Sequence, residues 1–298
     1  MPVIVITGCS TGIGYAAAET LARNGHTVYA TMRNPERSPQ LKQFAAENHL
    51  PIHISPLDVL DDQSVQSSIN MILSKEGQID VLVNNAGIHS WGAVEELPLD
   101  SFKLEMDTNY FGTLRCIKAV LPSMRKRKAG CIINNTSIAG KLYSNFHGTY
   151  CPSKAAVEAL SETLAQELMP FNIRVALVEP AFIETPIFQK TNEIHTNTHY
   201  PNIKRFLSMF AASLENHESP YLVADLINDI VTGKRTNFRN AAGLYAEGFL
   251  NFRSSMSDEN WISGVSESDD AWANGMEQMG LKVKKYMQAE GLPEFNTR

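Results

Sequence analysis

The chain has 298 residues, of which 43% are hydrophobic and 19% are charged, and its formal net charge at pH 7 is -6. This length and composition are typical of a globular protein with a sizeable core. The acidic balance argues against general binding to nucleic acids or to anionic membranes, because both need clustered positive charge.

The cysteines and the hydropathy pattern indicate a cellular compartment. The four cysteines are scattered without CxxC spacing, which indicates free thiols in a reducing environment. No charged and apolar leader precedes Val3, and no apolar run approaches the ~18 residues of a membrane span. We therefore expect a cytoplasmic protein without a membrane span. The HTNTH segment, His195 to His199, has zinc-like spacing but no intervening glutamate, so we expect no metal site.

Short β-rich runs alternate with helical patterns along the chain. In chain order, the pattern predicts a strand at 3–8, a helix at 14–25, strands at 26–33 and 52–59, a helix at 64–77, a strand at 79–87, a helix at 102–124, a strand at 130–137, a helix at 150–171 and a strand at 173–181. This alternation predicts an α/β fold with a Rossmann-type, doubly wound parallel sheet and helices on both faces.

The last part of the chain is expected to form an extension beyond a single domain at residues 1–250. Residues 251–298 turn polar, but they contain an amphipathic helix at about 269–290 by the spacing of their apolar side chains. Those side chains are Trp272, Met276, Met279, Val283 and Met287. The helix packs on its own domain in one interpretation and contacts a second subunit in the other.

The first predicted strand runs into the sequence TGCSTGIG, which contains Gly8, Gly12 and Gly14. In a sheet of this kind, ligands bind beyond the carboxyl ends of the strands. Glycines there let the backbone approach a pyrophosphate, whose charge meets the amino end of the following helix. The alternative is a tight strand-to-helix turn without a ligand.

Tyr150 and Lys154 open a predicted helix and are four residues apart, so they lie on one face of it. A free tyrosine has a pKa of about 10, and a nearby ammonium group lowers that pKa by stabilising the phenolate. Such a pair is suited to proton transfer. Pro152 is acceptable between them because first-turn amides lack intrahelical partners. The alternative is a helix-end aromatic beside a solvated charge.

Further polar residues follow the strands. Asn84 to Gly87 end the fourth strand and Ser137 ends the fifth, while Asn109 lies inside a helix, where asparagine is a poor helix former. With the glycines and the Tyr-Lys pair, these residues resemble the classical short-chain dehydrogenase/reductase family over about residues 3–187. The resemblance is nearest to its NADP-dependent 17β-hydroxysteroid dehydrogenase and retinol dehydrogenase branch.

The resemblance implies a catalytic tetrad. Ser137 would hydrogen-bond the substrate oxygen, and Tyr150 would give or take its proton. Lys154 would lower the Tyr150 pKa and hold the nicotinamide ribose, and Asn109 would position a water that relays protons. The cofactor-binding residues implied are Gly8, Ser10, Thr11, Gly12, Ile13, Gly14, Arg33, Asp58, Val59, Asn85, Ala86, Gly87, Tyr150, Lys154, Pro180, Ile183 and Thr185.

One position departs from the family pattern, because Ala181 occupies a place where many members have glycine. The residues after the second strand bear on cofactor choice. The position at which NAD-dependent members carry an acid holds Thr31 or Met32, and Arg33 follows. A guanidinium matches the 2′-phosphate of NADP, so NADPH is the expected cofactor. The alternative is that Arg33 is a loop charge paired with Glu36.

The resemblance also places a substrate lid at about residues 182–221. Its aromatic and apolar side chains are Phe188, Tyr200, Phe206, Leu207, Met209 and Phe210. They favour a hydrophobic steroid-like, retinoid-like or aromatic carbonyl substrate, although they could instead dock the lid on the core.

The expected function is therefore NADPH-dependent reduction of a ketone or aldehyde, reversible as alcohol oxidation. By family resemblance the protein would be a homodimer or homotetramer. The other possibilities are a non-catalytic NADP(H)-binding redox sensor and an interaction protein, neither of which needs the complete tetrad.

Overall fold

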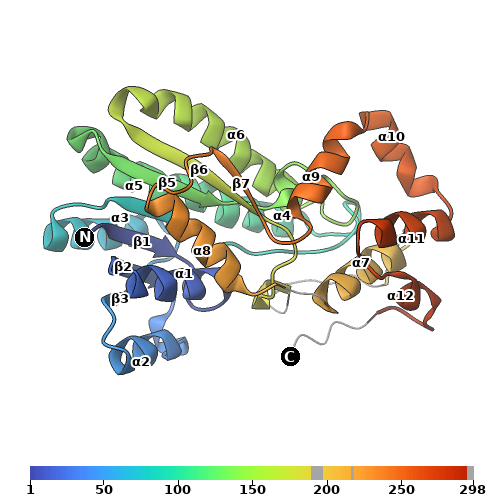
Figure 1. The fold of residues 1–298 in the computed structure, drawn as a ribbon, viewed down its shortest axis with the longest axis horizontal. Helices are drawn as coiled ribbons and strands as arrows, with labels where there is room; N and C mark the ends of the chain where they lie inside the picture. The colour runs from blue at the N-terminus through green and yellow to red at the C-terminus, as the bar shows by residue number, and fades with distance from the viewer. Residues whose placement is uncertain (189–196, 216–217, 294–298) are drawn as a thin grey trace.

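A parallel sheet with seven strands, in the order β3-β2-β1-β4-β5-β6-β7, forms the centre of the molecule. The computed structural model describes residues 1–188, 197–215 and 218–293 (Figure 1). The strands are β1 (Val3–Thr7), β2 (Thr27–Met32), β3 (Ile52–Pro56), β4 (Val81–Asn84), β5 (Gly130–Asn135), β6 (Ile173–Pro180) and β7 (Arg239–Ala242). The six predicted strands are confirmed, and each is shorter than its predicted run.

Helices connect and flank these strands, and several of them add to the predicted elements. The α-helices are α1 (Gly12–Arg23), α2 (Gln40–Glu47), α3 (Asp62–Glu76), α4 (Leu99–Met106), α5 (Gly112–Arg127), α6 (Tyr150–Leu168), α7 (Ile203–Glu215), α8 (Pro220–Val231), α9 (Ala246–Ser255), α10 (Asp258–Ser263), α11 (Asp269–Gln278) and α12 (Lys284–Gln288). Short 3-10 turns are η1 (Pro35–Arg37), η3 (Ile138–Gly140), η4 (Met169–Phe171), η5 (Pro186–Phe188) and η6 (Gly264–Ser266).

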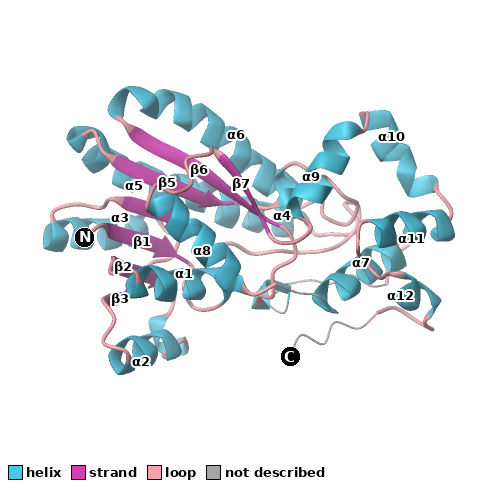
Figure 2. Cartoon of the chain, viewed as in Figure 1, coloured by secondary structure: helices cyan, strands magenta, loops and turns pink. Residues whose placement is uncertain are grey.

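The sheet is covered on both faces, which confirms the doubly wound fold (Figure 2). Side chains alternate along a strand, so Ile4 and Ile6 face the layer of α1, α2 and α8. Val3 and Val5 face the layer of α3, α5 and α6. Strands buried on both sides explain the nearly continuous apolar runs in the sequence.

The helix predicted at 102–124 is interrupted. Residues Asp107–Phe111 form a π-helical turn between α4 and α5. A π turn accommodates an extra residue within a helix and is frequent at functional sites. Here the turn contains Thr108 and Asn109, and both are buried.

The amphipathic helix predicted at about 269–290 is wrong as a single element, because α11 and α12 are separate helices. Gly280 lies between them with a φ of 94°, a left-handed conformation that ends a helix. Ala273, Leu281 and Val283 are buried in one cluster with Phe249 of α9. The extension therefore packs on its own domain, close to the carboxyl ends of the strands (Figure 2). Whether residue 250 is a domain boundary stays a prediction.

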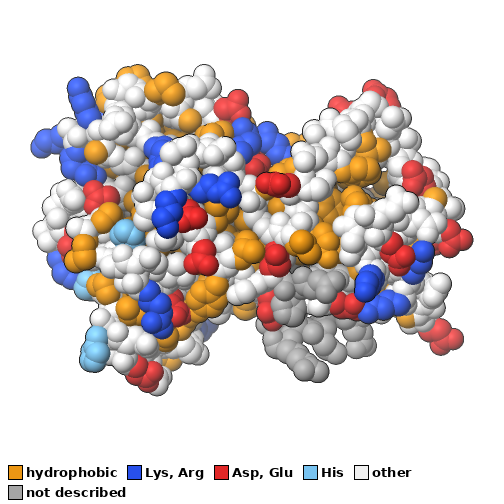
Figure 3. Space-filling model, viewed as in Figure 1, with side chains coloured by type: hydrophobic (Ala, Val, Ile, Leu, Met, Phe, Trp, Pro, Cys, Tyr) orange, Lys and Arg blue, Asp and Glu red, His pale blue; other side chains and the backbone are white. Residues whose placement is uncertain are grey.

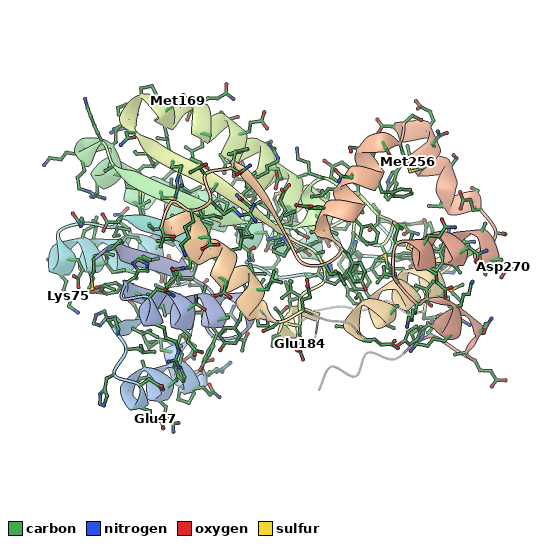
Figure 4. The ribbon with its side chains drawn as sticks, viewed as in Figure 1. Glu47, Lys75, Met169, Glu184, Met256 and Asp270 are labelled. Atoms are coloured by element: carbon green, nitrogen blue, oxygen red, sulfur yellow. The ribbon has the colours of Figure 1, made fainter. Side chains whose placement is uncertain are left out.

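Arg205 on α7 fastens this extension. Its guanidinium donates to Asp269 Oδ1 at 2.6 Å, to the Val265 carbonyl at 3.2 Å and to the Glu267 carbonyl at 2.6 Å. It also lies 5.8 Å from the centre of the Trp272 ring. These contacts join α7 to residues 265–272, and Figure 4 labels Asp270 within this stretch. Helix α7 and the extension therefore form one packed unit.

The surface charges are mixed, and the cysteines form no disulfide. Acidic and basic side chains are interspersed over the face drawn in Figure 3. All four cysteines are buried free thiols. In the part of the chain that the structure describes, no helix has both the length and the hydropathy of a transmembrane segment.

Gly14 tests the packing of α1 against the sheet. A Cβ at this position would lie 2.5 Å from both the Gly8 carbonyl oxygen and Asn85 Nδ2. Gly14→Ala should therefore lower the free energy of unfolding by about 1–3 kcal/mol, the usual cost of overpacking. Gly248→Ala is the matched control, because a Cβ there meets no atom within 4 Å. Urea denaturation should find the control neutral or stabilised by about 0.4–1 kcal/mol, and equal effects of the two variants would contradict the packing.

Candidate active site

A cavity of about 580 Å³ opens at the carboxyl ends of the strands, between the glycine-rich turn and α7. The predicted site residues that line this cavity are Gly8, Ser10, Thr11, Gly12, Ile13, Arg33, Asp58, Val59, Asn85, Ala86, Gly87, Ser137, Tyr150, Lys154, Pro180, Ile183 and Thr185. Gly14 and Asn109 lie behind the wall. The structure thus brings residues from the ends of six strands, β1 to β6, into one space.

The glycine-rich turn provides a cradle that side chains would fill. Gly8 has a φ of 74°, and a Cβ there would lie 2.8 Å from Ala86 Cα. Gly12, with a φ of 60°, begins α1, and Thr11 is its N-cap residue. Free backbone amides at a helix N-terminus bind anions. The turn therefore fits the pyrophosphate of a dinucleotide.

The strand ends beside this cradle are tied together by Asn85. Its backbone amide donates to Thr7 Oγ1 at 3.0 Å, and its Nδ2 donates to the carbonyls of Thr7 at 2.9 Å and Gly8 at 3.2 Å. Its Oδ1 accepts from Asn135 Nδ2 at 3.0 Å. These bonds connect the ends of β1, β4 and β5, so the floor of the cavity is fixed.

Hydrogen bonds to the backbone fix the side chains of Lys154 and Asn109. Lys154 Nζ donates to the Asn135 carbonyl at 3.0 Å and lies 5.5 Å from the centre of the Tyr150 ring. Asn109 accepts from the Ile88 amide at 2.9 Å and donates to the Ile88 carbonyl at 3.0 Å. It also donates to Ser153 Oγ at 2.9 Å. The π turn therefore places an amide group where it clamps the segment after β4 to α6.

Ser137 lies at the end of β5 and caps a short 3-10 turn. Its Oγ accepts from the Ala139 amide at 3.1 Å and donates to the Pro180 carbonyl at 3.3 Å. Burial raises the pKa of Tyr150, the charge of Glu105 raises it further, and a hydrogen bond from Ser137 opposes both. The phenol is therefore neutral in the free protein.

The Lys154 ammonium is buried as well. Burial lowers the pKa of Lys154 to about 8, and the carboxylates of Glu105 and Glu158 hold it from falling further. Since the ammonium lies beside the Tyr150 ring, it can stabilise a phenolate formed during proton transfer.

Two histidines that the sequence analysis missed stand next to Tyr150. The His89 ring lies 4.4 Å from the Tyr150 ring, edge to face, and 5.1 Å from the His147 ring. Burial lowers the pKa of His147 to about 3 and that of His89 well below its usual value. Both line the cavity as neutral imidazoles. The only signal in the sequence is the position of His89, two residues after the strand-end motif NNAG.

Each neutral imidazole has one ring nitrogen anchored. His89 Nε2 accepts from Trp91 Nε1 at 2.7 Å, and His147 Nδ1 lies 2.6 Å from Ser144 Oγ. These bonds fix the planes of the two rings. The part of the cavity beside Tyr150 therefore offers oriented polar groups within an aromatic wall.

The residues after β2 bear on the cofactor. Thr31 is buried and its Oγ1 donates to the Ile6 carbonyl at 2.9 Å, so its side chain points into the sheet. Met32 and Arg33 both line the cavity, and Arg33 is exposed. Within the described residues, no ion pair joins Arg33 to Glu36. The guanidinium is therefore available to a ligand.

The predicted lid residues divide into two groups. Met209 and Phe210 line the cavity, whereas Phe206 and Leu207 pack behind them in a cluster with Trp91. Phe206 and Leu207 therefore dock the lid on the core, and a substrate wall formed by Met209 and Phe210 stays a prediction.

The remaining lid predictions fall away from the cavity or outside the described part. Tyr200 is exposed, and its hydroxyl donates to Glu95 Oε2 at 2.6 Å, so its place in the substrate wall is wrong. The side chain of Phe188 and all of His195 lie outside the described residues.

Ala181 is accommodated without strain. Its amide donates to the Ala242 carbonyl at 2.9 Å, which continues the pairing of β6 with β7. The described non-glycine residues with positive φ do not include Ala181. Alanine at this position is therefore compatible with the local backbone.

The buried imidazole of His147 should make stability depend on pH. Its pKa is about 3 in the folded protein and about 6.5 in an unfolded chain. The stability that it contributes is present above pH 6.5 and is lost as pH falls toward 3, because only the unfolded chain then takes up the proton. Between pH 7 and pH 5, His147→Asn should lose about 2 kcal/mol less than the wild-type protein.

The measurement is urea denaturation at both pH values. His49→Asn is the matched control, since solvent reaches that ring in the folded protein. If both variants keep the wild-type pH dependence, the buried neutral state of His147 is contradicted.

A family model described as short chain dehydrogenase matches residues 2–196. The 3-ketodihydrosphingosine reductase of Bacteroides thetaiotaomicron is 36% identical, over 81% of this chain and 87% of the relative. Retinol dehydrogenase 8 of Bos taurus is 39% identical, over 66% of this chain and 64% of the relative. The 17-beta-hydroxysteroid dehydrogenase type 1 of Homo sapiens is 34% identical, over 71% of this chain and 67% of the relative.

Solved structures agree with these relatives. A short-chain dehydrogenase from Streptomyces avermitilis superimposes with a TM-score of 0.74 at 29% identity, covering 94% of this chain and 97% of that structure. A variant of actinorhodin polyketide ketoreductase with NADPH has a TM-score of 0.71 at 26% identity. The match covers 80% of this chain and 95% of that structure. The chain therefore belongs to the short-chain dehydrogenase/reductase family of oxidoreductases, and retinol and hydroxysteroid dehydrogenases are among its relatives.

Proposed function

We propose that this protein reduces a hydrophobic ketone or aldehyde with NADPH, and that Tyr150 is the general acid. The observation that carries the proposal is the convergence of Ser137, Tyr150 and Lys154 on the cavity that contains the glycine cradle. A redox sensor or an interaction protein would need the cradle but not the three reacting side chains beside it. The same groups run alcohol oxidation in reverse, with Tyr150 as the base.

The chain's own residues account for binding and proton transfer. NADPH, when bound, supplies the hydride. Ser137 would exchange its 3.3 Å bond to the Pro180 carbonyl for a bond to the substrate oxygen. Tyr150 then gives its proton to that oxygen as negative charge develops there. Lys154 stabilises the phenolate that remains.

Asn109 is assigned to the proton supply. Its amide is saturated by Ile88 and Ser153, so it acts by fixing the backbone rather than by touching substrate. Ile88 and Lys154 both line the cavity, so a rigid Ile88 carbonyl is a suitable site for the water that returns protons to Tyr150. Asn109 also leaves little room for a side chain at position 87, since a Cβ on Gly87 would lie 3.2 Å from Asn109 Oδ1.

The substrate is proposed to be largely apolar. Phe182, Met209, Phe210 and Phe249 line the cavity, and apolar walls favour apolar ligands. The relatives named for a 3-ketodihydrosphingosine, a retinol and a hydroxysteroid point to the same substrate class. We further assign the protein to the cytoplasm and expect a homodimer or homotetramer.

NADPH is preferred over NADH in this proposal because of Arg33. The residue lines the cavity next to Met32, and the end of β2 holds Thr31 and Met32 in place of a carboxylate that would repel a 2′-phosphate. Ser10, which also lines the cavity, can add a hydroxyl donor. The Asp58 side chain is fixed within its own loop, because its Oδ1 accepts from the Leu60 amide at 3.1 Å. Since Asp58 also lines the cavity, we assign it a place beside the adenine.

The proposed reaction is tested by NADPH consumption with a panel of steroid-like, retinoid-like and aromatic carbonyl compounds. Tyr150→Phe should keep cofactor binding, while kcat falls at least about a hundredfold because the general acid is lost. Near-normal turnover by this variant would remove the mechanism. Activity restricted to small polar sugars or hydroxy acids would contradict the apolar substrate.

Cofactor preference is tested separately. Arg33→Ala should weaken NADPH binding by about 1.5–3 kcal/mol, the range for a hydrogen bond to a charged group, and leave NADH binding nearly unchanged. Met32→Asp should shift the preference toward NADH by repelling the 2′-phosphate. Calorimetric titration of both variants with both cofactors measures the shift. Equal affinities of the wild-type protein for NADPH and NADH would refute the assignment and leave the Tyr150 mechanism intact.

A further inference from the structure

His147 is a polar side chain packed among aromatic rings at the cavity, and the mechanism above does not use it. Its ring lies 4.9 Å from the Phe206 ring, 5.5 Å from the Phe210 ring and 6.1 Å from the Tyr150 ring. The residue is 6% exposed, and it lines the cavity. A phenylalanine would fill such a place without the cost of burying polar nitrogens. The imidazole therefore needs a physical account.

The backbone holds His147 in place from two sides. The Gly92 amide donates to the Phe146 carbonyl at 3.1 Å, and Gly92 pairs with His147 in an isolated bridge. The Cys151 amide, in the first turn of α6, donates to the His147 carbonyl at 3.0 Å. Phe146 has a φ of 61°, and a non-glycine residue keeps such a left-handed conformation where its surroundings determine it. The His147 ring thus has a fixed place beside Tyr150.

The two ring nitrogens of His147 have different surroundings. Nδ1 lies 2.6 Å from Ser144 Oγ. Nε2 has no hydrogen-bond partner among the described residues, yet it is not one of their fully buried unpaired atoms. Nε2 therefore keeps accessible surface, and the cavity that His147 lines is the space that provides it. Solvent in an open cavity can bond to this atom, whereas a bound substrate expels that solvent.

A substrate that fills the cavity must bond to Nε2 or leave it unpaired. A site that hydrogen-bonds a substrate hydroxyl rejects analogues without one, because its own polar group is then unpaired. Burial lowers the pKa of His147 to about 3, so the ring is neutral and a charged substituent gains no ion pair from it. The Ser144 hydroxyl can donate to Nδ1 or accept from it, so Nε2 is either an acceptor or a donor. A hydroxyl group on the substrate both donates and accepts, and therefore fits either tautomer.

We propose that His147 determines substrate specificity by bonding a hydroxyl group that the substrate carries one or two carbons from its reacting carbonyl. In the proposed reaction the carbonyl oxygen bonds to Tyr150. Because the His147 ring is 6.1 Å from the Tyr150 ring, a substituent must be close to the carbonyl to bond to His147 at the same time. The substrate class is thus narrowed to α- or β-hydroxy carbonyl compounds with an apolar body. This inference rests on the proposed function for the place of the carbonyl, but not for the binding of a hydroxyl group by His147.

The direct test compares the binding of matched ketones. α-Hydroxyacetophenone and propiophenone differ by a hydroxyl group in place of a methyl group, and β-hydroxypropiophenone and butyrophenone repeat the comparison one carbon further. Calorimetric titration measures their affinities for the protein with and without oxidised NADP, which cannot reduce them. In at least one pair the hydroxy ketone should bind about 10- to 100-fold more tightly, since its partner leaves Nε2 unpaired. Equal affinities within both pairs, or no binding of any of these ketones, would overturn the proposal.

Variants connect the preference to His147. His147→Phe keeps an aromatic ring without nitrogens and should bring the affinity ratio within each pair close to one. His147→Gln should keep part of the preference, because its amide nitrogen is as many bonds from Cα as Nε2. The ratio compares two ligands on one protein sample, so partial unfolding of a variant does not change it. Asn145→Ala is the matched control, since Asn145 is exposed and is not part of the cavity lining. A ratio that His147→Phe leaves unchanged, or that Asn145→Ala lowers equally, would overturn the proposal.

Turnover provides the second readout and separates the inference from the proposed function. With NADPH, the kcat/KM ratio within a pair should favour the hydroxy ketone by about the same factor, and His147→Phe should lose that preference. If the affinity ratios behave as expected but no ketone is reduced, the inference stands and the proposed function fails. If both members of each pair are reduced with equal kcat/KM, the proposed function stands and the inference is overturned.

Discussion

The hydrogen bonds of Asn85 across the ends of three parallel strands are the constraint on which the site depends. Thr7 Oγ1 accepts from the amides of both Asn85 and Ala86, and the Asn85 side chain reaches the Gly8 carbonyl and Asn135. Parallel strands would otherwise splay where their ladder bonds end. Because these bonds fix the strand ends, the glycine cradle and the Lys154 anchor on the Asn135 carbonyl share one rigid floor.

Burial is the second constraint on the site. It makes the protonation states of Tyr150 and Lys154 depend on a few neighbouring side chains. The carboxyl groups of Glu105 and Glu158 both raise the pKa of Lys154 against the effect of burial, and their surroundings differ. Glu158 accepts from Thr136 Oγ1 at 2.7 Å and from Arg239 Nε at 3.2 Å, so its charge is held by partners of its own. Glu105 has no such ion pair among the described residues. Glu158 is thus held by partners of its own, whereas Glu105 is fully buried and its pKa is raised to about 8.

The sequence could predict the elements whose side chains alone decide the structure. Apolar runs such as Val3 to Gly8 reveal buried strands, and glycines reveal the turn that a Cβ would block. The strand at Arg239–Ala242 escapes notice because its pairing with β6 rather than its own residues makes it a strand. The π turn at Asp107–Phe111 and the break at Gly280 depend on tertiary packing. Wall and docking residues of the lid look alike in sequence, since both must be apolar.

The contacts of Arg205 have an evolutionary consequence. Ser137, Tyr150 and Lys154 lie within residues 2–196, the part matched by the family model, whereas Met209 and Phe249 in the cavity wall come from later in the chain. Such a chain can diversify its substrate range while its chemistry is inherited unchanged. Arg205 limits this freedom, because α7 and the extension meet at its bond to Asp269. Loss of Asp269 would leave the largely buried guanidinium of Arg205 without its ion pair, so a substitution at Asp269 should be accompanied by one at Arg205 across lineages.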